Sequence, residues 1–128
     1  MQKKILQIHR ESGERLEECT LSIDLAGMFL FKSKYAQTKQ ISEKALQISR
    51  EIGHREAEAC CYRNLGAVYL SVGEYEKARE HLQKSLSIAK EIEDRDFEAR
   101  CYAELGSVFK SVCEAEKARE HHQKSLTI

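Results

Sequence analysis

The sequence repeats itself with a period of forty residues, and this repeat constrains the fold more than any other feature. The segment EYEKAREHLQKSL at 74–86 returns as EAEKAREHHQKSL at 114–126. Residues 61–88 and 101–128 are identical at 19 of 28 positions. Two further shifts of forty residues toward the N-terminus bring weaker copies into the same register. A period of about 20 to 50 residues predicts a solenoid, in which each unit packs against the next one.

The register divides residues 1–128 into a single array. We expect 1–13 to end a preceding repeat, 14–53 to form repeat 1, 54–93 repeat 2 and 94–128 a truncated repeat 3. Within a unit, apolar residues recur at helical spacing, as in Cys61, Leu65, Val68 and Val72. The pattern therefore predicts an all-α chain with a half-helix followed by three antiparallel helix pairs. Their expected ranges are 2–11, then 15–32 with 35–52, 55–72 with 74–92, and 95–112 with 114–128.

Glycines and one acidic residue mark the expected turns between these helices. Gly53 and Gly73 follow helical stretches and can adopt the left-handed backbone that ends a helix. Asp94 is placed to cap the next helix with its carboxylate. Cys113 stands where the preceding unit has Gly73, and a Cβ atom strains a left-handed turn. We therefore expect an unusual, partly exposed thiol at Cys113.

Composition excludes several classes of protein. Lys plus Arg equals Asp plus Glu at 21 each, which disfavours a nucleic-acid binder because such proteins carry a basic excess or stripe. The chain has no proline and only six glycines, as expected for a helical array. No apolar run reaches the roughly 20 residues that a membrane span needs, and the N-terminus lacks an apolar signal core. Five cysteines, an odd number inside helical patterns, favour reduced thiols and a cytoplasmic location.

No residue cluster predicts catalysis, a metal site or a cofactor. Neighbouring residues on a helix point about 100° apart, so His121 and His122 are not placed to share one metal ion. Cys60 and Cys61 are adjacent as well and lack the spacing of a zinc or redox motif. Cys61 and Cys101 occupy matching inward positions and are expected to be small apolar core residues. We predict that the chain is not an enzyme.

The central unit, AEACCYRNLGAVYLSVGEYEKAREHLQKSLSIA at 57–89, resembles a tetratricopeptide repeat. Its pattern positions are filled by Tyr62, Leu65, Gly66, Tyr69, Gly73, Tyr75 and Ala78. The third unit supplies Tyr102, Leu105, Gly106, Phe109 and Ala118, whereas the first supplies Leu25, Ala26, Phe29, Tyr35 and Ala45 but departs from the pattern at Ser22 and Thr38. The forty-residue period is similar to the long-repeat branch, which includes cell-polarity adaptors of G-protein signalling and kinesin light chains.

The resemblance implies a right-handed α-solenoid, the superhelix of this family, whose concave groove binds a peptide segment of a partner protein. The implied groove residues flank the Leu-Gly positions. They are Ile23, Asp24, Gly27, Leu30 and Phe31 in the first unit, Arg63, Asn64, Ala67 and Leu70 in the second, and Arg100, Ala103, Glu104, Ser107 and Lys110 in the third. In this interpretation Asn64 bonds main-chain amides and the cations take acidic side chains. A carboxylate clamp of the family would need a further Asn where Ala67 stands.

Two other functions remain open from the sequence. In one of them, the chain is a self-assembling structural unit that forms a homo-oligomer through its open ends. This function requires that the apolar residues at those ends stay uncovered. These residues are Ile5, Leu6 and Ile8 at one end and Leu126 and Ile128 at the other. Helical repeats can also bind RNA, but the balanced charge disfavours that function.

Overall fold

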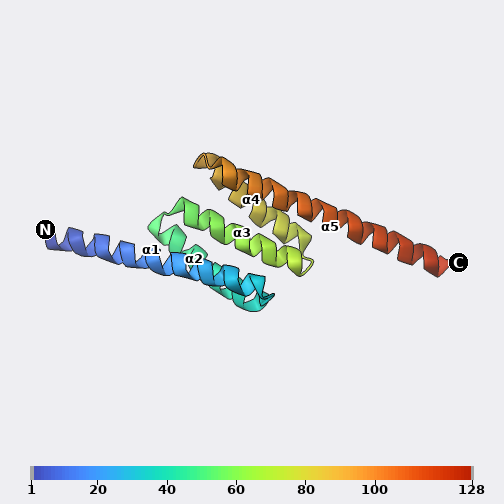
Figure 1. Ribbon diagram of the computed structural model, residues 1–128, viewed down its shortest axis with the longest axis horizontal. Helices are drawn as coiled ribbons and strands as arrows, with labels where there is room; N and C mark the ends of the chain where they lie inside the picture. Colours follow the sequence, from blue (N-terminus) through green and yellow to red (C-terminus); the bar gives the residue numbers. More distant parts are fainter. Residues whose placement is uncertain (1, 128) are drawn as a thin grey trace.

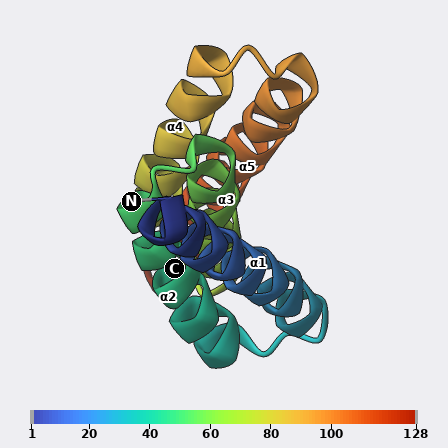
Figure 2. The same cartoon turned by 90° about the vertical axis from the view of Figure 1, so that its left-hand side faces the viewer.

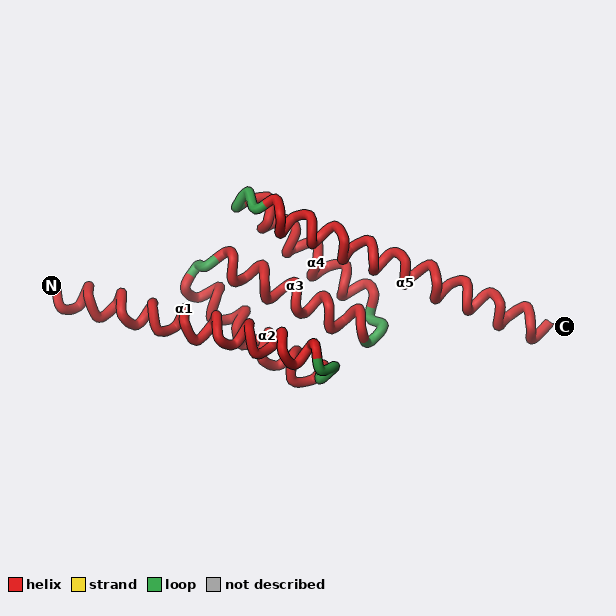
Figure 3. The backbone as a smooth tube through the Cα atoms, in the orientation of Figure 1, coloured by secondary structure: helices red, strands yellow, loops and turns green. Residues whose placement is uncertain are grey.

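The protein consists of helices joined by short turns. The computed structural model describes the backbone of residues 2–127 and the side chains of residues 11, 13–120 and 123. Five helices follow one another: α1 (Gln2–Phe31), α2 (Tyr35–Ile52), α3 (Arg55–Ser71), α4 (Tyr75–Glu91) and α5 (Arg95–Thr127) (Figure 1). Figure 3 shows short loops between them and no strand within the described backbone.

Successive helices pack against each other and build two layers. α3 lies between α2 and α4, and it also touches α1 and α5. Among the described residues no Cα atom of α2 lies within 8 Å of one of α4. The layer of α1, α3 and α5 is therefore the tighter, concave side of a crescent, and α2 with α4 forms the outer side (Figure 2). The predicted fold class, an all-α solenoid of antiparallel helix pairs, is confirmed.

The core consists of apolar clusters that each span several helices. One cluster joins Leu65 and Tyr69 of α3 to Leu82 of α4 and to Leu105 and Val108 of α5. A second joins α1, α2 and α3 through Cys19, Ala45, Ile48, Ala57 and Cys61. Cys61 and Cys101 are fully buried, which confirms that they are small core residues. Because every cluster draws on more than one hairpin, no hairpin buries its apolar face alone.

The turns between helices fall at a fixed interval of twenty residues. Ser33, Gly53, Gly73 and Glu93 all have positive φ, between 59° and 82°. After each of them, the next backbone N–H bonds to a carbonyl five residues earlier, for example Glu74 N to Tyr69 O at 2.8 Å. This is the bond of a left-handed helix C-cap. Asp94 accepts from Phe97 N at 3.1 Å, so the predicted N-cap is confirmed.

The expected breaks at both ends of the array are wrong. The expected helices 2–11 and 15–32 are joined in one helix, α1 (Gln2–Phe31), and 95–112 and 114–128 are joined in one helix, α5 (Arg95–Thr127). The two matching turn positions, Gly13 and Cys113, are helical. Both long helices therefore extend past the packed core, in opposite directions (Figure 1). The Cβ atom of Cys113 does not by itself explain the missing turn, because Ser33 and Glu93 also carry a Cβ atom and still adopt the left-handed conformation.

The better explanation for the missing turn is that a returning helix beyond Cys113 would bury too little apolar surface. In α4, Leu82 is fully buried and Tyr75 packs against the core cluster. The matching positions beyond Cys113 hold Ala115 and His122. Replacing a buried leucine and a packed tyrosine removes about 2 kcal/mol of burial for each side chain, and a left-handed non-glycine residue costs about 1 kcal/mol or more. The third hairpin therefore lacks the packing that closes the second one.

The straight course of α5 exposes a face that is covered in α3. Tyr62 and Tyr69 are 5% and 8% exposed because side chains of α4, together with Arg50 and Lys39 of α2, lie over their rings. The matching residues of α5, Tyr102 and Phe109, are 50% and 62% exposed. Equal positions of the repeat pattern therefore lie in the core on α3 and at the surface on α5. The returning helix that would cover Tyr102 and Phe109 continues away from the core instead.

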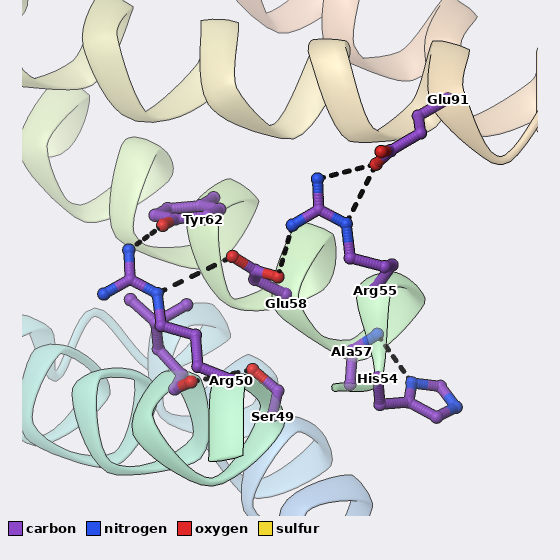
Figure 4. A network of polar contacts seen from close by, with 9 residues as sticks. Ser49, Arg50, His54, Arg55, Ala57, Glu58, Tyr62 and Glu91 are labelled. Carbon is purple, nitrogen blue, oxygen red and sulfur yellow. Dashed lines mark hydrogen bonds and ion pairs between the residues drawn. The ribbon is translucent and has the colours of Figure 1, made fainter. Parts of the chain in front are cut away.

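A buried carboxylate ties the middle three helices together on another side. Glu58 of α3 is only 8% exposed. Its oxygens lie 2.8 Å from Nη1 of Arg55 and 3.6 Å from Nε of Arg50 on α2 (Figure 4). Arg55 also reaches Glu91 of α4 at 2.6 Å, and Arg50 donates to the hydroxyl of Tyr62. Two cations therefore compensate one desolvated carboxylate and connect α2, α3 and α4.

The first prediction compares two glycines at matching positions. A Cβ atom at Gly66 would lie 2.7 Å from Cγ of the buried Leu82, whereas one at Gly106 meets nothing within 4 Å. We expect Gly66→Ala to lower the free energy of unfolding by about 1–3 kcal/mol through overpacking. Gly106→Ala should raise it by about 0.5–1 kcal/mol, since alanine favours a helix. Urea denaturation in dilute solution measures both, and equal effects would contradict the packing described for α3 and α4.

The second prediction concerns the buried carboxylate. Glu58→Gln removes the charge that Arg50 and Arg55 share, and we expect the free energy of unfolding to fall by about 1–3 kcal/mol. The exposed Glu56 lies in the same first turn of α3 and serves as the control. Glu56→Gln also removes a negative charge near the helix N-terminus but breaks no buried ion pair. The free energy of unfolding should therefore change by no more than about 0.5 kcal/mol. An equal loss in both variants would mean that the buried network adds nothing.

Candidate functional site

The predicted groove residues lie on the three helices of the concave layer. Ile23, Asp24, Leu30 and Phe31 belong to α1, Arg63, Asn64 and Leu70 to α3, and Arg100, Glu104, Ser107 and Lys110 to α5. Because the repeat places equal positions side by side on neighbouring helices, they form rows across the crescent. One row is polar, Asp24, Asn64 and Glu104, and the adjacent row is small, Gly27, Ala67 and Ser107. In the polar row Asp24 is exposed, whereas Asn64 and Glu104 are half-buried.

Arg63 and Glu104 are already paired. Nε of Arg63 lies 2.6 Å from Oε1 of Glu104, joining α3 to α5, and its guanidinium lies 6.0 Å from the centre of the Phe97 ring. Nε of Arg63 thus already has an acidic partner within the chain, and the binding of a partner's acidic side chain by Arg63 stays a prediction. The other carboxylate oxygen, Oε2 of Glu104, is buried and accepts no hydrogen bond. Sequence reasoning missed this pair, since no spacing rule links residues forty-one positions apart in sequence.

Other polar groups of the groove have no partner among the described residues. Asn64 is half-buried, and no hydrogen bond to its amide is made within that part of the chain. Arg100 and Lys110 on α5 are exposed and form no ion pair there. Ser107 differs, because its hydroxyl donates to the Ala103 carbonyl at 3.2 Å. The groove thus offers one amide and two cations to a ligand.

The apolar residues of the groove are divided between core and surface. Ile23 packs against the cluster around Cys61, and Leu70 packs against the cluster around Leu82. Leu30 is half-buried, whereas Phe31 is 91% exposed at the end of α1. Phe31 is therefore the most accessible apolar residue among the predicted groove residues.

A second exposed apolar stripe on α1 was not singled out from the sequence. Leu21, Leu25 and Met28 are 61%, 44% and 59% exposed. The matching residues of α3, Cys61, Leu65 and Val68, are buried between α3 and its neighbours. The repeat alignment contains the signal, but only the straight course of α1 shows that residues 2–11 do not fold back over the stripe.

The structure provides no basis for a metal centre or a reactive thiol in the core. Within the described side chains, no three His, Cys, Asp or Glu residues gather as a metal site would require. Burial raises the pKa of the Cys61 thiol to about 12, and burial also raises the pKa of Cys19, Cys60 and Cys101. These thiols stay protonated at neutral pH and are poor nucleophiles. Cys113 is exposed, as expected.

Some predicted residues fall outside the description. The side chains of Ile5, Leu6, Ile8, Leu126, His121 and His122, and the whole of Ile128, lie outside the described residues. The predicted self-association through the two ends therefore stays a prediction. Over the described part of the chain, no helix combines the length and the apolar character needed to cross a membrane.

Comparison with known proteins agrees with the helix packing. The sequence matches the tetratricopeptide repeat family over residues 16–91 and again over 63–128. The structure is similar to the crystal structure of the tetratricopeptide repeat domain of Arabidopsis FLU, with a TM-score of 0.61 and 20% identity. That match covers 86% of this chain and 98% of the FLU domain. Among curated protein sequences, no match is found. The chain belongs to the tetratricopeptide repeat family.

Proposed function

We propose that the chain is a non-enzymatic scaffold that binds a peptide segment of a partner protein in its concave groove. Tetratricopeptide repeats generally mediate protein–protein interactions, and their fold is generally a non-enzymatic scaffold. The observation that carries the proposal for this chain is the polar row on the concave face. Asn64 in this row is half-buried and makes no hydrogen bond within the described residues. Such groups gain most from a ligand that pairs with them.

The charges and apolar groups suggest the chemistry of the bound segment. Arg100 and Lys110 favour an acidic side chain over α5, while Phe31 favours an apolar side chain at the α1 end. The Asn64 amide can donate to a main-chain carbonyl and accept from a main-chain N–H of an extended segment. A segment that runs across α1, α3 and α5 with an apolar and an acidic end meets all of these groups.

The balanced charge favours a protein partner over RNA, because 21 basic residues meet 21 acidic ones. The forty-residue period is similar to that of the long-repeat adaptors and kinesin light chains, and this resemblance supports the same function. Five free cysteines support a cytoplasmic location.

The test first selects peptides that bind the chain and then substitutes single residues of the groove. Peptides are selected from a display library against the intact chain, and their dissociation constants are measured by fluorescence anisotropy. We expect Asn64→Ala to weaken binding about 10-fold, since one buried amide loses its partner. Lys110→Glu should weaken the binding of acidic peptides by a similar factor of about 10. Neither change touches an intramolecular bond of the described chain, so the melting temperature should stay constant.

The control is Lys84→Glu, which makes the same charge change on the exposed side of α4. It should leave the dissociation constants within about twofold, as for charges outside an interface. Peptides that bind Asn64→Ala and Lys110→Glu as tightly as the parent chain, or that lose affinity with Lys84→Glu, would place the binding site elsewhere.

A further inference from the structure

α5 carries an exposed stripe that has the spacing of a coiled coil. Its residues alternate at intervals of four and three over almost the whole helix. We call this the heptad stripe: Arg95, Ala99, Tyr102, Gly106, Phe109, Cys113, Glu116 and Glu120. All of these residues are exposed. A 4-3 spacing keeps residues on one side of a helix, and the apolar members, Ala99, Tyr102, Phe109 and Cys113, lie in the middle of the stripe, where a second helix can pack.

The matching face of α3 shows that a helix fits on this surface. Tyr62, Gly66 and Tyr69 correspond to Tyr102, Gly106 and Phe109, and α4 covers them in the antiparallel direction. On α5 the chain's own returning segment is not available, because the helix runs straight through Cys113. The face is thus shaped for an antiparallel helix that this chain does not supply to itself.

We propose that a second copy of the chain supplies it, and that two α5 helices pack antiparallel through their heptad stripes about a two-fold axis. In the register that overlaps the apolar residues best, Phe109 of each copy lies over Gly106 of the other, and Tyr102 lies beside Cys113. Gly106 has no atom within 4 Å of a Cβ position, so the ring of Phe109 has room to enter. An isologous two-fold contact of this kind forms a closed dimer.

The charges at the ends of the stripe agree with this register. Arg95 falls opposite Glu120 of the second copy, and at the flanks Glu98 falls opposite Arg119 and Asp96 opposite Lys117. Each pairing joins opposite charges, and the symmetry produces each of them twice. None of these six residues forms an ion pair in the described part of the chain. Flanking charges of this kind set the orientation of helix pairs, which argues for a second copy rather than an unrelated helix.

The dimer leaves the groove accessible. At 100° per residue, Arg100, Glu104 and Ser107 lie on the side of α5 opposite to Tyr102, Gly106 and Phe109. A dimer through the heptad stripe therefore presents two concave faces at once. This inference goes beyond peptide binding and does not depend on it.

The first test follows the oligomeric state. Sedimentation velocity of the whole chain, from micromolar to sub-millimolar concentration, should show a monomer–dimer equilibrium. Phe109→Glu should raise the dissociation constant of the dimer about 100-fold or more, since two buried rings are lost. Met28→Glu replaces another exposed apolar residue, on α1, and should leave the constant within about twofold. A monomer at every concentration, or a dimer lost only in Met28→Glu, overturns the proposal.

Charge reversal tests the orientation. Arg95→Glu places like charges together at both ends and should weaken the dimer about tenfold. The double variant Arg95→Glu with Glu120→Arg restores opposite charges and should recover the parent constant. Arg100→Glu makes the same change on the opposite side of α5 and should have no effect. Failure of the double variant to recover would exclude this antiparallel arrangement.

Crosslinking tests the register. Tyr102→Cys places a thiol beside Cys113 of the second copy, so mild oxidation should yield a covalent dimer with two such bonds. In the parent chain the two Cys113 residues lie about 16 Å apart along the helix pair and should not crosslink. Ser107→Cys, on the concave side, is the control and should stay monomeric in a denaturing gel. Crosslinking of the parent through Cys113, or of Ser107→Cys as readily as Tyr102→Cys, would overturn the register.

Discussion

Closure of a helix hairpin depends in this chain on what the second helix buries against the first. Leu82 of α4 sits over Gly66 of α3 so closely that a Cβ atom there would lie 2.7 Å from it. That contact lies in the same cluster as Leu105 and Val108 of α5, so it also positions the next helix. With Ala115 and His122 in place of Tyr75 and Leu82, the third unit lacks the contact and α5 stays straight.

The same constraint connects the fold to both proposed surfaces. Packing of α1, α3 and α5 in one layer brings Asp24, Asn64 and Glu104 into a row and creates the groove. Failure to close the third hairpin exposes Tyr102 and Phe109 on the other side of α5. The proposed peptide site and the proposed helix-pairing site thus arise from one repeat: the first where neighbouring units match, the second where the returning helix is missing. The two sites do not compete for the same surface.

Much of this fold could be predicted from the sequence. The period, the helical spacing and the glycine at Gly73 predicted the helices of the central unit and their order, because local pattern and packing agree there. The course of the chain at Cys113 could not be predicted, since left-handed turns at Ser33 and Glu93 show that the turn residue alone does not decide it. At the site, the positions of the groove residues followed from the repeat. The pairing of Arg63 with Glu104 depends on side-chain geometry across two helices, which no pattern in one helix contains.

A distance measurement on α5 tests the central claim most directly. Spin labels at residues 99 and 123 lie 24 positions apart, so a continuous helix places them about 36 Å apart. In a closed hairpin they would lie within about 20 Å, because Ser85 of α4 donates to the carbonyl of Ala59 of α3 at the matching place. With labelled chain diluted in unlabelled chain, pulsed dipolar spectroscopy should show the long distance. A single short distance would mean that the third hairpin closes, and would contradict this account of α5 and of its exposed face.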